Sequence, residues 1–158
     1  MIFLVMEIQS MKVYSNSFKN SEAIPSKYTC EGENVSLHVK WEGFPKETKS
    51  FVLIMSDPDA PIGTFYHWIL YDIPSNVNEI KEGESVGLKG KNDFGKLGYG
   101  GPCPPRGHGK HRYYITVYAL NVEKIGLKEG ASAKEVLKAI EGKVLAKGEI
   151  FGTYERKW

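Results

Sequence analysis

The sequence predicts a single, mostly β domain built as an antiparallel sandwich, with one helix near the C-terminus. Its 158 residues match the length of one domain with a sizeable core. Seventeen glycines and nine tyrosines favour turns and strands over a helical bundle. Short apolar runs separated by turns that contain Gly and Pro are typical of antiparallel sheets. With 41% hydrophobic and 25% charged residues, the composition excludes a wholly disordered chain.

Five segments are predicted strands. Residues 35–41 alternate between apolar and polar side chains, which indicates a strand buried on one face. Residues 50–56 are almost continuously apolar, as in a strand covered on both faces. Residues 67–73 and 113–120 are rich in aromatic and β-branched side chains, and residues 149–154 predict a last strand.

One segment between residues 132 and 146 predicts a helix instead. Ser132 and Glu135 form the pattern of a capping box, in which each side chain binds a free backbone N–H of the first turn. Apolar residues then recur at helical spacing: Val136, Leu137, Ile140, Val144 and Leu145. Gly142 lies inside this predicted helix at a cost of about 1 kcal/mol, and Gly148 is the expected stop.

The first eleven residues are interpreted as an N-terminal extension or a mis-called start, followed by a single domain over residues 12–158. Met6 and Met11 offer alternative starts to Met1. The first residues lack the basic region of a signal peptide. No apolar run approaches the roughly 20 residues of a membrane helix. We therefore expect a cytoplasmic protein with no transmembrane segment.

The net charge of +2 is too small to indicate a nucleic-acid partner. Its distribution is uneven, because the segment from residue 89 to 112 carries +5. The six cations there are Lys89, Lys91, Lys96, Arg106, Lys110 and Arg112, and the one acid is Asp93. Such a segment attracts small anions or acidic surfaces, or is simply a solvated loop.

The two cysteines, Cys30 and Cys103, are too few to predict a disulfide framework. Cys103 lies near His108 and His111, which raises the alternatives of a nucleophile or a metal ligand. No third residue is evident to orient a catalytic pair, and the spacing fits no zinc pattern well. The sequence therefore predicts no catalytic residue, no metal and no cofactor.

Three strand ends carry polar residues. Asp57-Pro-Asp-Ala-Pro61 follows the buried strand, and His67 lies in an aromatic stretch that opens the next one. A loop over residues 100–113, rich in Gly and Pro, runs into the last long strand. Taken singly, these features are an ordinary turn, a core histidine and a shaped loop.

Taken together, the three motifs resemble those of the phosphatidylethanolamine-binding protein family, in its compact bacterial and archaeal branch. Further matching segments are Ile24-Pro25, Tyr28-Thr29-Cys30, Trp41-Glu-Gly-Phe-Pro45 and Gly152-Thr-Tyr154-Glu-Arg156, so the resemblance spans about residues 12 to 156. The family implies a large central antiparallel sheet packed on a smaller one, with peripheral helices. It also implies a small pocket that holds phosphate, acetate or a phosphoethanolamine head group in relatives.

The resemblance assigns ligand-binding residues one by one. The polar wall of the pocket matches Asp57, His67, His111 and Tyr113, and the rim matches Pro61, Gly101, Pro104 and Pro105. Asp59 resembles a carboxylate that stabilises the turn, and Arg112 is expected to pair with an acidic residue. A sharp turn in relatives also implies a cis peptide bond between Ala60 and Pro61.

These assignments predict a non-catalytic, regulatory protein that binds a small anion or a phosphorylated head group. A protonated histidine and a tyrosine hydroxyl are suitable donors to an anion. The alternative is a protein inhibitor of a serine protease or a kinase that acts through surface loops. The resemblance further suggests a homodimer.

Overall fold

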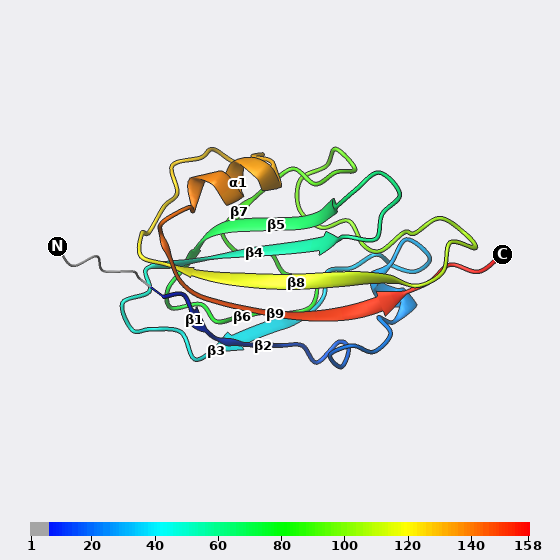
Figure 1. The fold of residues 1–158 in the computed structure, drawn as a ribbon, viewed down its shortest axis with the longest axis horizontal. Helices are drawn as coiled ribbons and strands as arrows, with labels where there is room; N and C mark the ends of the chain where they lie inside the picture. Colours follow the sequence, from blue (N-terminus) through cyan, green and yellow to red (C-terminus); the bar gives the residue numbers. More distant parts are fainter. Residues whose placement is uncertain (1–6) are drawn as a thin grey trace.

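Two β-sheets and one short α-helix form the fold in the computed structural model, which describes residues 7–158 (Figure 1). The larger sheet has six strands in the order β1-β9-β8-β4-β5-β7. Their bounds are β1 (Gln9–Ser10), β4 (Ser50–Asp57), β5 (Phe65–Pro74), β7 (Leu88–Lys89), β8 (His111–Leu120) and β9 (Val144–Tyr154). β1 runs parallel to β9, and all other neighbours in this sheet are antiparallel.

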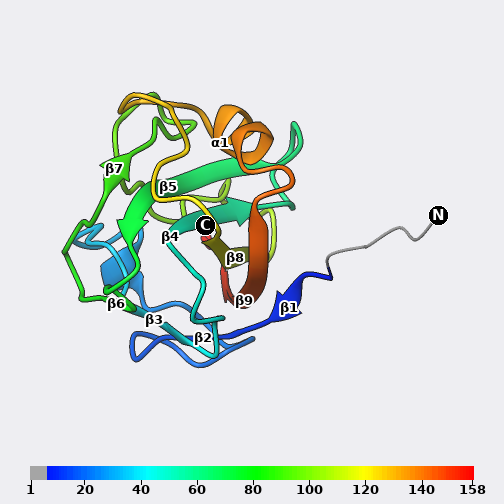
Figure 2. The ribbon, with the colours of Figure 1, turned by 90° about the vertical axis from the view of Figure 1, so that its left-hand side faces the viewer.

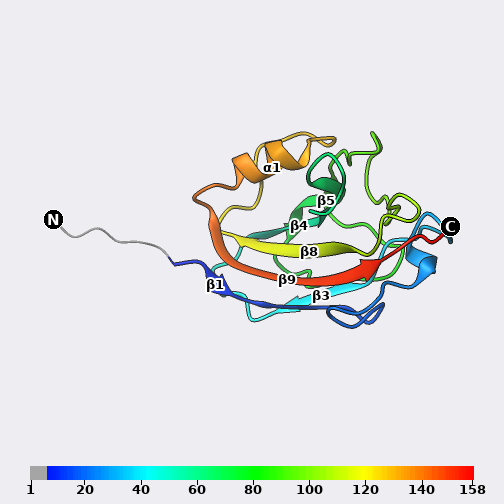
Figure 3. The same ribbon diagram turned by 45° about the vertical axis from the view of Figure 1, so that its right-hand side comes forward.

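The smaller sheet contains three antiparallel strands in the order β2-β3-β6, with bounds Lys12–Tyr14, Val39–Glu42 and Glu79–Ile80. It lies against one face of the large sheet, and helix α1 (Ala133–Ala139) lies over the other face (Figures 2 and 3). A short 3-10 helix, η1 (Ser26–Tyr28), lies in the connection between β2 and β3. The predicted mostly β fold, with a large sheet, a smaller sheet and a peripheral helix, is confirmed.

The core has two parts, one on each face of the large sheet. Between the sheets, Trp41 of β3 packs edge-on against Phe51 of β4 at 5.3 Å, and both side chains are fully buried. On the other face, Val52 of β4 packs in the same cluster as Val136 and Ile140 of the helical segment. β4 therefore has both faces covered, which explains the almost continuous apolar run predicted for it.

Helix α1 is shorter than the sequence indicates, and the prediction of a helix to residue 146 is wrong. The helix ends at Ala139 with Ile140 as its C-cap. Gly142 has a φ of +75°, in the left-handed region that glycine adopts most easily, and it reverses the chain. Val144 and Leu145 consequently begin β9, although their spacing also fits a helical face.

The N-terminal end of α1 has the predicted capping box. The backbone N–H of Glu135 donates to the Ser132 hydroxyl, and the backbone N–H of Ser132 donates to the Glu135 carboxylate. The change Ser132→Ala should lower the free energy of unfolding by about 1 kcal/mol, because the Glu135 backbone N–H loses its acceptor. Urea denaturation measures this, and an unchanged midpoint would refute a stabilising cap.

The large sheet also includes residues that were assigned to an N-terminal extension. β1 pairs with β9, and the backbone N–H of Met11 donates to the Lys147 carbonyl at 3.0 Å. The side chain of Met11 is buried in the core. Residues 9–11 are thus part of the domain, while the alternative starts at Met1 and Met6 lie outside the described residues. Within residues 7–158, no helix is long and apolar enough to cross a membrane.

Candidate functional site

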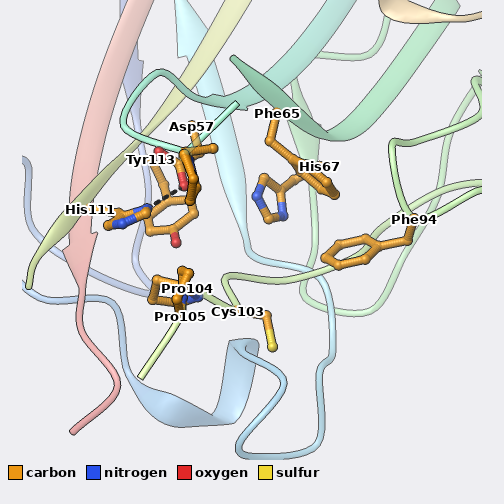
Figure 4. Close-up of a pocket in the computed structure, with 11 residues that line it drawn as sticks. Asp57, Phe65, His67, Phe94, Cys103, Pro104, Pro105, His111 and Tyr113 are labelled. Carbon is orange, nitrogen blue, oxygen red and sulfur yellow. Dashed lines mark hydrogen bonds and ion pairs between the residues drawn. The ribbon is translucent and has the colours of Figure 1, made fainter. Parts of the chain in front are cut away.

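A cavity of about 180 Å³ opens at the end of the large sheet where β4 ends and β5 and β8 begin (Figure 4). The antiparallel register places Asp57 opposite Phe65, and Ser56 opposite Tyr114. Side chains distant in the sequence therefore meet at this sheet edge. Seven of the eight residues expected at a ligand site line the cavity: Asp57, Pro61, His67, Pro104, Pro105, His111 and Tyr113.

Gly101 is the eighth residue, and it does not line the cavity. Its backbone N–H donates to the Asn34 side-chain carbonyl at 2.8 Å. A Cβ atom at this position would lie 2.1 Å from the backbone oxygen of Tyr28, which is closer than any real contact. Gly101 therefore allows the 101–110 loop to approach the chain around η1. It supports the rim of the cavity without lining it.

Asp57 and His111 form a buried pair in the wall of the cavity. The Asp57 Oδ2 atom lies 2.7 Å from His111 Nδ1, and the two residues are 3% and 2% exposed. The other carboxylate oxygen, Oδ1, accepts the backbone N–H of Asp59 at 2.7 Å. Because an ionised carboxylate only accepts hydrogen bonds, His111 Nδ1 carries a proton and donates it.

The second ring nitrogen of His111 is also engaged. His111 Nε2 lies 2.6 Å from Nδ1 of His108, a residue outside the cavity lining. His111 therefore has no free ring nitrogen for a ligand. It influences the cavity through its hydrogen bond to Asp57.

His67 is the histidine with a nitrogen available to the cavity. Its Nδ1 lies 2.7 Å from the Gly100 carbonyl, which can only accept, so Nδ1–H is the donor. This leaves Nε2 without a protein partner among the described residues, on a ring that lines the cavity (Figure 4). Burial lowers the pKa of His67, while the Gly100 carbonyl and the charge of Asp57 act in the opposite direction.

Tyr113 brings an unused donor to the same cavity. Its side chain is fully buried, and its hydroxyl has no hydrogen-bond partner among the described residues. In Figure 4 the hydroxyl points toward Pro104 on the rim. Burial raises the pKa of Tyr113 well above its usual range, so the hydroxyl keeps its proton. Such a buried, unpaired donor is costly unless something in the cavity accepts its hydrogen bond.

The turn after β4 is held by Asp59 and Arg112, as predicted. The guanidinium binds the carboxylate with two hydrogen bonds of 2.9 and 2.8 Å, and the Arg112 backbone N–H adds a third at 2.8 Å. The hydrogen bonds from Arg112 are the main cause that lowers the pKa of Asp59 to about 2. The pair ties the 57–61 turn to the start of β8, between Asp57 and His111.

The predicted cis bond between Ala60 and Pro61 is wrong, because the described residues contain no cis peptide bond. The chain reverses by another route. Gly63 has a φ of +111°, and its backbone N–H donates to the Ala60 carbonyl at 3.2 Å. A left-handed glycine two residues after Pro61 thus supplies the reversal.

The expectation that the two cysteines do not form a disulfide framework is also wrong. Cys30 and Cys103 are joined by a disulfide across 73 residues of sequence. Backbone contacts bring their two loops together, since Cys30 N–H donates to the Pro102 carbonyl and the Tyr99 hydroxyl donates to the Tyr28 carbonyl. The bond therefore attaches the cavity rim to the segment around η1.

Four cavity residues were not assigned from the sequence: Ala60, Phe65, Phe94 and Cys103. Ala60 lies within the 57–61 motif, and Phe65 lies two residues before His67. Their positions in the sequence could therefore have indicated that they line the cavity. Phe94 was not detectable, because it lies in the β7–β8 connection. The neighbouring Asp93 accepts the Tyr66 backbone N–H, which holds this connection against β5. The Phe94 ring consequently reaches the cavity, and its centroid lies 4.8 Å from that of Phe65.

The positive segment is partly neutralised. Arg106 lies 3.9 Å from Glu31, and Arg112 binds Asp59. Within residues 7–158, the four lysines of the segment form no ion pair: Lys89, Lys91, Lys96 and Lys110. The segment therefore keeps the charge of four lysines, none of which lines the cavity.

Comparison with known families identifies the same resemblance over most of the chain. A family model described as phosphatidylethanolamine-binding protein matches residues 14–155. A UPF0098 protein of Aquifex aeolicus is 58% identical over 152 residues, which cover 92% of this chain and 89% of the relative. A UPF0098 protein of Pyrococcus horikoshii is 52% identical and covers 96% of this chain and 79% of the relative.

Solved structures agree with the sequence comparison. The crystal structure of a phosphatidylethanolamine-binding protein homolog from Chlamydia trachomatis superposes with a TM-score of 0.87 at 38% identity, over 94% of this chain and 99% of that one. Escherichia coli YbcL, described as a member of the mammalian phosphatidylethanolamine-binding protein family, gives 0.86 at 34% identity, over 92% and 98%.

Proposed function

Because this chain belongs to the phosphatidylethanolamine-binding protein family, we propose that its cavity binds a small anion or a phosphorylated head group. The observation that carries the proposal is the buried Tyr113 hydroxyl, which has no partner among the described residues. It shares the cavity with His67, whose Nε2 is also unpaired. A bound oxyanion would accept a hydrogen bond from the Tyr113 hydroxyl and, when the His67 ring is protonated, from His67 Nε2–H.

The lining strengthens such contacts. Phe65, Phe94 and three prolines make most of the remaining wall apolar. Hydrogen bonds to a charged group are stronger in a low-dielectric cavity than in water. The Asp57 carboxylate opposes an anion, but its charge is balanced when His111 is protonated beside it.

The size of the cavity limits the ligand. A volume of about 180 Å³ accommodates phosphate, acetate or a head group but not acyl chains. So few contacts predict an affinity in the range of roughly micromolar to millimolar. Inorganic phosphate, acetate and phosphoethanolamine are therefore the probes with which to compare free anions and head groups.

The proposed role is regulatory binding without catalysis. Cys103 shares a disulfide with Cys30 and so offers no thiolate as a nucleophile. The cytoplasmic location and the homodimer remain predictions.

A second candidate function is inhibition of a serine protease or a kinase through the loop that follows β7. Phe94 and Leu97 in this loop are 45% and 52% exposed, and Lys96 lies between them in the sequence. Exposed apolar side chains among cations are suited to a protein contact. Titration with a panel of proteases and kinases separates the two functions, because loop-mediated inhibition survives the cavity change His67→Ala.

Acetate binding should weaken as the pH rises, and this tests the proposed function. Burial lowers the pKa of His67 from its ordinary 6.5, whereas a bound anion raises it. Binding therefore takes up a proton, and affinity should fall up to about tenfold per pH unit between these two pKa values. Calorimetry from pH 5 to 8 measures this, with acetate ionised throughout most of that range.

The change His67→Ala should weaken acetate binding at pH 5 and remove the part of the pH dependence that His67 contributes. His38→Ala is a matched control, because His38 is also buried but binds Glu79 on the side of the small sheet. Its profile should stay that of the wild type. Equal affinity at all pH values, together with an unaffected His67 variant, would refute the anion site.

A further inference from the structure

His108 lies outside the cavity but contacts the buried charge pair in its wall. Its Nδ1 is 2.6 Å from His111 Nε2, and the two rings are 4.8 Å apart in an edge-on arrangement. His108 is exposed, whereas His111 and Asp57 are only 2% and 3% exposed. Three side chains thus form a continuous hydrogen-bonded chain from solvent to the buried carboxylate.

The position of each proton in this chain follows from its partners. Asp57 accepts from His111 Nδ1–H, so only one proton can lie between His111 Nε2 and His108 Nδ1. With His111 neutral, this proton belongs to His108, which donates it. With His111 charged, Nε2–H donates to His108 Nδ1, and neutral His108 carries its own proton on Nε2.

We propose that His108 is a positioning residue for anion binding, which passes a proton from solvent to His111 and stabilises its charged form. A solvent acid protonates His108 Nε2. The His108 Nδ1–H bond then breaks as the His111 Nε2–H bond forms. His108 ends neutral, His111 ends with one positive charge, and one proton has been taken up. This inference rests on the anion-binding function proposed above.

The need for this proton comes from Asp57. An anion in the cavity lies beside a buried carboxylate, and two negative charges at one buried site repel strongly. Protonation of His111 makes the Asp57–His111 pair neutral and removes most of that repulsion. Because the ligand itself occupies the cavity, a path through His108 delivers the proton from the other side of the ring.

Other charged and titratable groups surround His111 on each element packed against it. Asp57 and Asp59 follow β4, His67 lies on β5, Arg112 and Tyr113 lie on β8, and Tyr154 and Arg156 lie on β9 and beyond. Asp59 is already paired with Arg112, and the Arg156 Nε–H donates to the Pro104 carbonyl. Of these groups, Asp57 makes a direct hydrogen bond to the His111 ring and favours its charged form.

The first test needs no ligand. The titration of His111 is followed by NMR of its ring nitrogens in the wild type and in His108→Ala. Loss of the acceptor for Nε2–H should lower the fraction of charged His111 at a given pH. His108→Asn should restore most of this fraction, since its side-chain oxygen can accept the same hydrogen bond. Lys134→Ala, an exposed change on helix α1, should leave the titration unchanged.

The second test measures acetate binding in the same variants. At pH 7, His108→Ala should weaken acetate affinity by about tenfold, the effect expected from the loss of one hydrogen bond to a charged group. The difference should vanish at low pH, where His111 is protonated in both proteins. Calorimetry in two buffers with different ionisation enthalpies should also show a smaller proton uptake for His108→Ala at pH 7.

The outcomes separate this inference from the proposed function. If the wild type binds acetate but His108→Ala leaves the His111 titration unchanged, the role of His108 is refuted and the anion site stands. A titration of His108→Asn equal to that of His108→Ala would also refute it, because the hydrogen bond is the stated cause. If the wild type binds no anion at any pH, both proposals fail.

Discussion

Reduction of the Cys30–Cys103 disulfide should lower the free energy of unfolding by about 4 kcal/mol, from the chain-entropy cost of a loop of about 73 residues. The bond restricts the unfolded chain, so its loss favours the unfolded state. Urea denaturation with and without a thiol reductant measures the difference. The double change Cys30→Ser with Cys103→Ser should reproduce it and remove any response to the reductant.

The same reduction should weaken ligand binding in the protein that remains folded. Cys103, Pro104 and Pro105 line the cavity, and the disulfide attaches this rim to the loop after η1. Hydrogen bonds at Gly101 and Tyr99 hold the rim in part, so we expect weaker binding rather than none. Two titratable thiols in the untreated native protein would refute the disulfide. An unchanged denaturation midpoint on reduction would refute its stabilising effect.

Tyr113→Phe should weaken anion binding by about 10- to 100-fold without destabilising the protein, since hydrogen bonds to charged groups contribute about 1.5–3 kcal/mol. The hydroxyl has no partner among the described residues, so the free protein loses no internal hydrogen bond. Removing an unpaired buried polar group should leave the free energy of unfolding unchanged or raise it. Calorimetry with acetate and urea denaturation measure the two effects.

Tyr71→Phe is the matched control for this change. Tyr71 is equally buried, but its hydroxyl donates to the Lys128 carbonyl and accepts the Ala131 N–H at 3.2 Å, on the helix side of the sheet. Its loss should destabilise the protein and leave acetate affinity intact. The reverse result, with Tyr113→Phe destabilised and binding normally, would show that the hydroxyl serves the fold and not a ligand.

Much of the fold is predictable because the burial of each strand determines its pattern of apolar residues. β4 lies between β5 and β8 with both faces covered, so residues 51–55 are apolar throughout. The helix boundary was less clear, because Val144 and Leu145 fit both a helical face and the start of β9. The left-handed Gly142 decides between them, and a sequence does not state which glycines adopt that conformation.

The candidate site was predictable in its motifs and less so in its connections. Asp57, His67, His111 and Tyr113 stand at strand ends, and the register of β4, β5 and β8 brings them together. The disulfide, the place of Phe94 and the contact of His108 with His111 depend on how long loops fold over the sheet edge. Neither the periodicity of apolar residues nor the spacing of motifs along the chain specifies such contacts between loops.

The position of a bound anion tests the central claim most directly. Crystals of protein purified without phosphate or acetate are soaked in selenate below pH 6, and the anomalous scattering of selenium locates the anion. The account predicts a peak in the cavity with selenate oxygens about 2.6–3.2 Å from the Tyr113 hydroxyl and His67 Nε2. An empty cavity at saturating selenate, with peaks only at surface lysines, would contradict it.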